Sequence, residues 1–137
     1  MARKALITGI SGQDGAYLAR FLLEQGYEVV GAQRRGASSS TWRREELGVL
    51  DRIRLVPLEL LELGNILRVI EEVRPDEIYN LAAQSFVGMA FDQPLYTSDV
   101  DAMGVTRLLE AVRIVDPSIR FYQASTSEMF GKVQEMP

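Results

Sequence analysis

The stretch Gly9-Ile10-Ser11-Gly12-Gln13-Asp14-Gly15 stands between a short apolar run, Ala5 to Ile7, and an amphipathic segment that begins at Ala16. The run is typical of a buried strand, and the amphipathic segment predicts a helix. Glycines at this junction let backbone N–H groups approach a pyrophosphate, whose charge the helix N-terminus favours. The sequence therefore predicts a nucleotide-binding loop, since a plain structural turn would need one glycine rather than several.

Strands and helices alternate on both sides of this loop. Strands are expected at residues 5–8, 28–33, 53–58, 78–82 and 121–124. Helices are expected from Ala16 to a C-cap at Gly26, from Leu63 to Val73 and from Pro94 to Val115, and residues 34–44 read as a long loop. This alternation predicts an α/β fold, a Rossmann-type doubly wound parallel sheet with strand order 3-2-1-4-5.

The amino-acid composition limits the functions that the chain can perform. The chain has 137 residues, 47% of them hydrophobic, which suits one globular domain, and its net charge of -4 argues against a general nucleic-acid binder. It contains no cysteine and no histidine, so acid–base work falls to Asp, Glu, Tyr or Lys, and no metal site is expected. No apolar run is long enough for a signal peptide or a bilayer span, so we expect a cytoplasmic protein with no membrane partner.

Polar residues gather where the predicted strands end. They are Ser11 to Asp14, Arg34 with Arg35, Glu59, Gln84 with Ser85, and Thr126 with Glu128. Ligands of open parallel sheets bind beyond the carboxyl ends of the strands. The sequence therefore predicts one ligand site at this edge of the sheet.

The end of the second strand predicts which dinucleotide binds. NAD-binding proteins place Asp or Glu there to accept a hydrogen bond from the ribose 2′-hydroxyl, whereas this chain has Gln33, Arg34 and Arg35. Guanidinium groups hold a 2′-phosphate through charge-assisted bonds, so NADP is the expected cofactor. The alternative is that the two arginines are solvated surface charges.

Other candidates have two interpretations each. The small residues of Leu81-Ala82-Ala83-Gln84-Ser85 suit both helix packing and a backbone that runs beside a cofactor. Tyr96 suits either a cover over adenine or a packing role on the sheet. The hydroxyls and carboxylate of Ser125-Thr126-Ser127-Glu128 suit sugar binding and proton abstraction, or an ST-turn with a helix N-cap.

These motifs together resemble the GDP-mannose 4,6-dehydratase family, and the Gly-x-x-Gly-x-x-Gly spacing resembles the short-chain dehydrogenase/reductase form of the loop. The resemblance is carried by Gly9 to Leu18, the Arg34-Arg35 loop to Arg43, Asn80 to Val87, Asp99 to Gly104 and Ala124 to Gly131. It implies a lyase with tightly held NADP that converts GDP-mannose to GDP-4-keto-6-deoxymannose. It also implies a homo-tetramer in which the Arg34–Arg43 loop reaches a neighbouring subunit.

The resemblance also implies roles for individual residues. Cofactor contacts would come from Gly9, Ile10, Ser11, Gly12, Gln13, Asp14, Gly15, Arg34, Arg35, Glu59, Leu60, Leu81, Ala82, Ala83, Gln84, Ser85 and Tyr96. Glu128 would be the base that removes the proton from C5, Thr126 would bind the C4 oxygen, and Ser127 would support them. Ser85, Thr126 and Glu128 would contact the substrate.

The sequence departs from the family pattern at two points. Glu59 stands where the family often has Asp near the adenine, and the family's Tyr-x-x-x-Lys belongs beyond Pro137. We therefore expect residues 1–137 to form an incomplete NADP-binding domain that lacks the last strands and the substrate domain and is inactive alone. The alternatives are another nucleotide-sugar dehydratase or epimerase and a non-catalytic NADP-binding module.

Overall fold

The computed structural model describes residues 2–35, 41–132 and 135, with the side chain of Ser127 excepted. Its sheet contains β1 (Lys4–Thr8), β2 (Glu28–Gln33), β3 (Arg54–Pro57), β4 (Glu77–Asn80) and β5 (Arg120–Gln123). The strands are parallel and lie in the order β3-β2-β1-β4-β5. The predicted fold class and strand order are confirmed.

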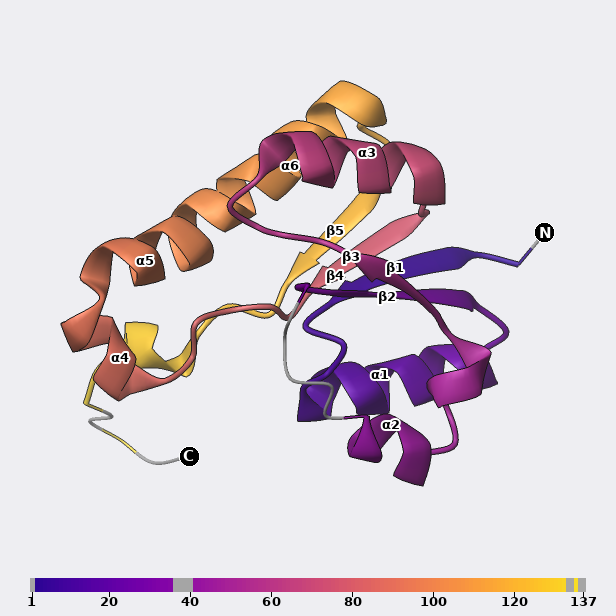
Figure 1. Ribbon diagram of the computed structural model, residues 1–137, viewed down its shortest axis with the longest axis horizontal. Helices are drawn as coiled ribbons and strands as arrows, with labels where there is room; N and C mark the ends of the chain where they lie inside the picture. The colour runs from indigo at the N-terminus through magenta and orange to yellow at the C-terminus, as the bar shows by residue number, and fades with distance from the viewer. Residues whose placement is uncertain (1, 36–40, 133–134, 136–137) are drawn as a thin grey trace.

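Helices cover both faces of the sheet (Figure 1). They are α1 (Gln13–Glu24), α2 (Trp42–Glu46), α3 (Leu63–Val73), α4 (Val87–Asp92), α5 (Pro94–Ser98) and α6 (Gly104–Val115). Helices α3 and α6 lie on one face, and α1 and α2 lie on the other. Short 3-10 turns occur at Leu50–Arg52 and Ser127–Phe130, and a π-helical turn, Asp99–Met103, joins α5 to α6.

The core consists of two clusters, one on each side of the sheet. Val30 and Ala32 of β2 pack into the cluster under α3 and α6, while Val29 packs into the cluster under α1. Successive side chains of a strand point to opposite faces, and burial on both faces explains why the central residues of β1 and β2 are apolar. This two-sided core is the physical basis of the doubly wound arrangement.

Helix α1 packs closely through its small residues. Ala16 and Ala19 are buried, whereas Tyr17 and Phe21, which contribute to its helical periodicity in the sequence, are mostly exposed. Gly26, with φ of +80°, follows the helix in the left-handed region, as the sequence predicts for its end.

Apart from shifts of a few residues at the ends of elements, the structure differs from the sequence prediction in three places. The predicted loop becomes helical at Trp42, and its residues 36–40 lie outside the described part of the chain. The predicted helix from Pro94 to Val115 begins and ends where predicted, but a π-helical turn at Asp99–Met103 divides it into α5 and α6. The extra residue in that turn shifts the helical spacing only locally. Helix α4 is absent from the sequence prediction, because its apolar residues are exposed and form no one-sided pattern.

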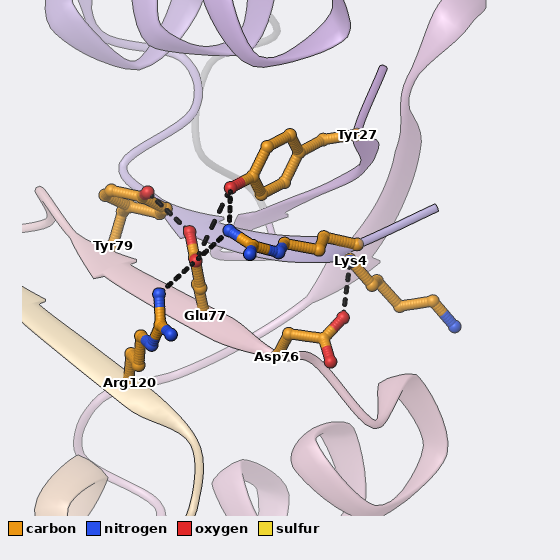
Figure 2. A network of polar contacts seen from close by, with 7 residues as sticks. Lys4, Tyr27, Asp76, Glu77, Tyr79 and Arg120 are labelled. Carbon is orange, nitrogen blue, oxygen red and sulfur yellow. Dashed lines mark hydrogen bonds and ion pairs between the residues drawn. The ribbon is translucent and has the colours of Figure 1, made fainter. Parts of the chain in front are cut away.

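The amino edge of the sheet holds a closed polar network (Figure 2). Glu77, only 8% exposed, accepts hydrogen bonds from Tyr79 Oη at 2.7 Å and Tyr27 Oη at 3.4 Å, and forms ion pairs with Arg3 and Arg120. Burial, followed by the hydrogen bond to Glu77, raises the pKa of Tyr79 to about 12. A smaller cavity of about 260 Å³ lies at this edge.

Within residues 2–35 and 41–132, none of the helices combines the length and apolar character that crossing a bilayer requires.

Candidate functional site

A large cavity opens at the carboxyl edge of the sheet, where the sequence predicts the ligand site. Its volume is about 1090 Å³, and its walls come from four parts of the chain: the glycine loop, the segment 80–87, residues of the α4–α6 region, and the segment after β5. This volume lies slightly above the range of roughly 300–1,000 Å³ for ligand pockets, which suits a ligand as large as a dinucleotide.

The glycine loop is shaped by close backbone approaches. Gly9 has φ of +69°, and a Cβ there would lie 2.9 Å from the backbone nitrogen of Ala82. A Cβ at Gly15 would lie 2.5 Å from the carbonyl oxygen of Gly9. Gly12 is the N-cap of α1 and offers no side chain to satisfy the first N–H groups of that helix. These backbone donors at the cavity wall fit a pyrophosphate.

A buried polar network fixes the loop after β4 against the glycine loop. Thr8 Oγ1 accepts hydrogen bonds from the backbone nitrogens of Leu81 and Ala82, both at 3.1 Å, and donates to Asn80 Oδ1 at 2.5 Å. Asn80 Nδ2 donates to Gln123 Oε1 at 2.7 Å. The carboxyl ends of β1, β4 and β5 are therefore joined side chain to side chain beneath the cavity.

The segment that follows is held by Asp101, a residue of the π-helical turn. Asp101 Oδ1 accepts a hydrogen bond from the backbone nitrogen of Gln84 at 2.7 Å. The Gln84 side chain makes two hydrogen bonds to the backbone of Phe86. Its Nε2 donates to the carbonyl oxygen at 3.1 Å, and its Oε1 accepts from the N–H at 2.8 Å. The Gln84 side chain thus shapes this wall of the cavity. Ser85 also lines the cavity.

The predicted chemical residues meet the same cavity from the segment after β5. Thr126 and Glu128 both line it, as does Ser125, which adopts φ of +61°. Thr126 Oγ1 also accepts a hydrogen bond from the backbone nitrogen of Glu128 at 3.2 Å. Thr126 is therefore the N-cap of the short 3-10 turn, which is the structural role that the sequence offered as the alternative to catalysis. The two interpretations are therefore compatible. The side chain of Ser127 lies outside the described part of the structure.

Several predicted cofactor residues do not line this cavity. Ile10 is fully buried in the core under α1, and the carbonyl of Ser11 accepts from Arg43 Nη1 at 3.5 Å. Leu60 is buried under α3 and α6, while Glu59 is half-buried and its backbone N–H donates to Asn65 Oδ1 at 2.7 Å.

Arg34 and Tyr96 form a pair beyond the end of β2. Arg34 Nη1 donates to Tyr96 Oη at 2.7 Å, and the Tyr96 ring packs against the core under α3 and α6. The packing interpretation of Tyr96 is confirmed, and its hydroxyl also holds the guanidinium of Arg34. Its contact with adenine stays a prediction. Arg35 is exposed at the end of the described segment.

Sequence reasoning missed other residues of the site. Asn80 and Gln123 are polar residues at strand ends, so the pattern that selected Gln84 and Thr126 contained the signal for them. Asp101 had no such signal, because its position depends on the π-helical turn. Phe86 and Phe91 also line the cavity, although Phe91 is 83% exposed.

Comparison with known proteins defines the class of fold first. A UDP-glucose 4-epimerase from Brucella ovis, solved in complex with NAD, superposes with a TM-score of 0.83 at 21% identity, over 99% of this chain and 39% of the epimerase chain. The chain thus has the Rossmann-type fold seen in nucleotide-sugar epimerases.

The family follows from the sequence. The profile of the family described as GDP-mannose 4,6 dehydratase matches residues 6–137, and this chain belongs to that family. A GDP-mannose 4,6-dehydratase from Yersinia enterocolitica is 54% identical over 98% of the chain, and the one from Homo sapiens is 51% identical over 97%. The chain spans 38% of the length of each of these curated relatives.

Proposed function

We propose that this chain is the cofactor-binding part of an NADP-dependent GDP-mannose 4,6-dehydratase, a lyase. The observation that carries the proposal is the meeting of two groups of residues in one cavity. The glycine loop enters from β1, and Thr126 and Glu128 enter from the segment after β5. A phosphate cradle and a candidate base in one cavity fit an enzyme that uses a dinucleotide on a sugar.

The residues present fit a pyridine dinucleotide. The uncapped N-terminus of α1 would hold the pyrophosphate, and the backbone from Leu81 to Ala83 would lie beside the ribose and nicotinamide. The absence of a carboxylate at Gln33, Arg34 and Arg35 favours NADP over NAD. Replacing both arginines with Ala should weaken NADP⁺ binding far more than NAD⁺ binding, and equal weakening would contradict this assignment.

Bound NADP supplies hydride acceptance at C4 of the sugar and hydride return at C6. Thr126 would donate a hydrogen bond to the C4 oxygen, with Ser127 supporting it. Oxidation at C4 acidifies the C5 proton, which Glu128 would take and pass to the departing hydroxyl at C6, so that water leaves. A carboxylate suits this step because the chain contains no histidine.

A chimera tests this proposal. Residues 1–137 would replace the matching part of the Yersinia enterocolitica relative, and mass spectrometry would follow GDP-mannose. We expect a product lighter by one water. Glu128→Gln should lower kcat by about 10²–10⁴-fold, the usual contribution of general acid–base catalysis.

The matched control is Glu71→Gln, which changes an exposed carboxylate on α3 and should leave kcat unchanged. A product of unchanged mass would indicate epimerisation, and full activity of the Glu128→Gln chimera would remove Glu128 from the mechanism.

The proposal includes a homo-tetramer in which the Arg34–Arg43 segment reaches a neighbouring subunit. Its support is the family resemblance of that segment, and sedimentation equilibrium of the chimera would measure the assembly. A monomer would contradict it.

A further inference from the structure

Arg44 is the most deeply buried ionisable side chain in the described part of the chain, with 1% of its surface exposed. It belongs to α2. Its Nη1 donates to Gln33 Oε1 at 3.4 Å, while its Nε has no hydrogen-bond partner among the described residues. None of the ion pairs formed by those residues involves it. Burial lowers the pKa of this guanidinium.

Such a placement is unfavourable by itself. Arginine usually buries its aliphatic stem and leaves the guanidinium in water, whereas the whole Arg44 side chain is enclosed. A buried cation without a counter-ion loses hydration that one long hydrogen bond does not replace. A nearby anion would offset this cost, and none of the described side chains provides one in contact.

Gln33, the partner of Arg44, occupies the position that selects the cofactor. It is the last residue of β2, where NAD-binding proteins place a carboxylate. Strand alternation puts Gln33 on the same face as Val29, which packs under α1. Because a guanidinium only donates hydrogen bonds, Arg44 must engage Oε1 of Gln33. The Nε2 group of Gln33 is then left to donate to another partner.

A donor at this position distinguishes the two dinucleotides. A carboxylate accepts from the ribose 2′-hydroxyl and repels a phosphate, while an amide N–H donates to a phosphate oxygen. Arg43 lies on the same helix, and its Nη1 reaches the carbonyl of Ser11 at 3.5 Å. Positive charge is therefore concentrated between the end of β2 and the glycine loop.

We infer that Arg44 is a selectivity residue for the 2′-phosphate of the cofactor, acting as a positioning residue through Gln33. It holds the Gln33 amide so that Nε2 is available as a donor, and its buried charge favours an anion at the end of β2. This inference rests on the proposed use of NADP. It differs from the roles of Arg34 and Arg35, which would contact the phosphate directly.

Calorimetric titration of the purified protein tests the inference. NADP⁺ and NAD⁺ are compared, and adenosine 2′,5′-bisphosphate and 5′-AMP serve as probes that lack the nicotinamide. Arg44→Met should raise the Kd for NADP⁺ and the bisphosphate at least about tenfold, because the variant loses both the buried positive charge and the contact that orients the Gln33 amide. It should change the Kd for NAD⁺ and 5′-AMP less than about threefold. Arg68→Met, the same change at an exposed position on α3, is the control and should alter neither value.

Gln33→Glu provides a second test that retains Arg44. The new carboxylate can pair with the guanidinium, and we expect the protein to prefer NAD⁺. Continued preference for NADP⁺ in this variant would overturn the inference, as would a fall in NAD⁺ and NADP⁺ affinity by the same factor in Arg44→Met. A wild-type protein that does not prefer NADP⁺ would overturn the proposed cofactor as well. Failure of the proposed cofactor can therefore be distinguished from failure of the role of Arg44 alone.

Discussion

Thr8 shows how one hydroxyl determines the shape of the cavity wall. Its Oγ1 is the acceptor for two successive backbone N–H groups, those of Leu81 and Ala82, and it is also the donor to Asn80. The residue is 1% exposed, so water cannot replace these bonds. The close approach of Gly9 to Ala82 depends on the same arrangement.

We therefore expect Thr8→Val to lower the free energy of unfolding by about 3 kcal/mol, because it leaves buried donors and an acceptor unpaired. Urea denaturation followed by circular dichroism measures this change. Thr106→Val is the control: Thr106 is exposed on α6, and its hydroxyl bonds, among the described residues, only to the carbonyl of Ala102, so its loss should cost less than about 0.5 kcal/mol. Equal losses in the two variants would contradict the role of Thr8.

Residue type alone identifies the glycine loop as a candidate site, but it does not predict that Arg44 is buried. Gly9 and Gly15 stand out in the sequence because a plain turn between a strand and a helix does not need repeated glycines, and the backbone contacts now supply the reason for them. Arg44 does not stand out, because arginine is usually exposed. Its burial depends on α2, which lies where the sequence predicts a loop.

At the scale of elements, the π-helical turn between α5 and α6 is tied to the cavity. Arg107 Nη2 donates to Asp99 Oδ1 at 2.7 Å, and its Nη1 donates to the carbonyl of Asp99 at 3.2 Å, which anchors the start of the turn. Asp101, in the same turn, accepts from Gln84. π-helical turns are often found at functional sites.

Asp101→Ala should release the backbone N–H of Gln84. We expect its amide hydrogen to exchange at least about tenfold faster, since a hydrogen bond to a charged group contributes about 1.5–3 kcal/mol. Asp101→Asn retains an acceptor oxygen and should keep exchange near the wild-type rate. Rapid exchange in the Asn variant as well would show that the amide is not held by this oxygen.

The amino ends of β1, β4 and β5 are joined by the Glu77 network, which gives the sheet a defined pH dependence. The pKa of Tyr79 is about 12 in the folded protein against 10.0 ordinarily, so folding favours the protonated phenol. The stabilisation that the protonated Tyr79 contributes to the folded state is fully present below pH 10, and it is lost as the pH rises towards 12.

Urea denaturation measures the free energy of unfolding across this pH range. For the wild-type protein it should fall by about 2 kcal/mol more than for Tyr79→Phe, which lacks the titrating phenol. Tyr122→Phe is the control, because Tyr122 is 54% exposed and should lose stability as the wild type does. If the free energy of unfolding depended on pH in the same way in the wild type and in Tyr79→Phe, the buried Tyr79 phenol and its hydrogen bond to Glu77 would not be the cause.

Across the whole molecule, the predicted sheet order is correct because buried parallel strands leave a strong sequence signal. Leu6, Val30 and Ile78 lie in apolar runs bounded by turn residues, and all three are in the core under α3 and α6. The split of the long helix and the Arg34–Tyr96 pair could not be predicted in this way. Arg107, which anchors the π-helical turn, also donates to the carbonyl of Leu60, and Arg34 lies 62 residues from Tyr96, so both features involve contacts between residues distant in sequence.

Among the described residues, two cavities lie at opposite edges of the sheet, and of these the carboxyl-edge cavity fits a dinucleotide. It has about 1090 Å³ and uncapped backbone donors, whereas the amino-edge cavity has about 260 Å³ and is lined by the partly paired charges of Arg3, Glu77 and Arg120. We therefore expect NADP to bind at the carboxyl edge.

Amide chemical-shift mapping by nuclear magnetic resonance tests this expectation directly, because the 137-residue chain has a mass of only 15.3 kDa. Titration with NADP⁺ should shift the amides of Gly9, Gly12, Gly15, Ala82 and Thr126 and leave those of Asp76 and Ser118 unchanged. Shifts confined to Asp76 and Ser118 at the amino edge, or no shifts at saturating NADP⁺, would contradict the account.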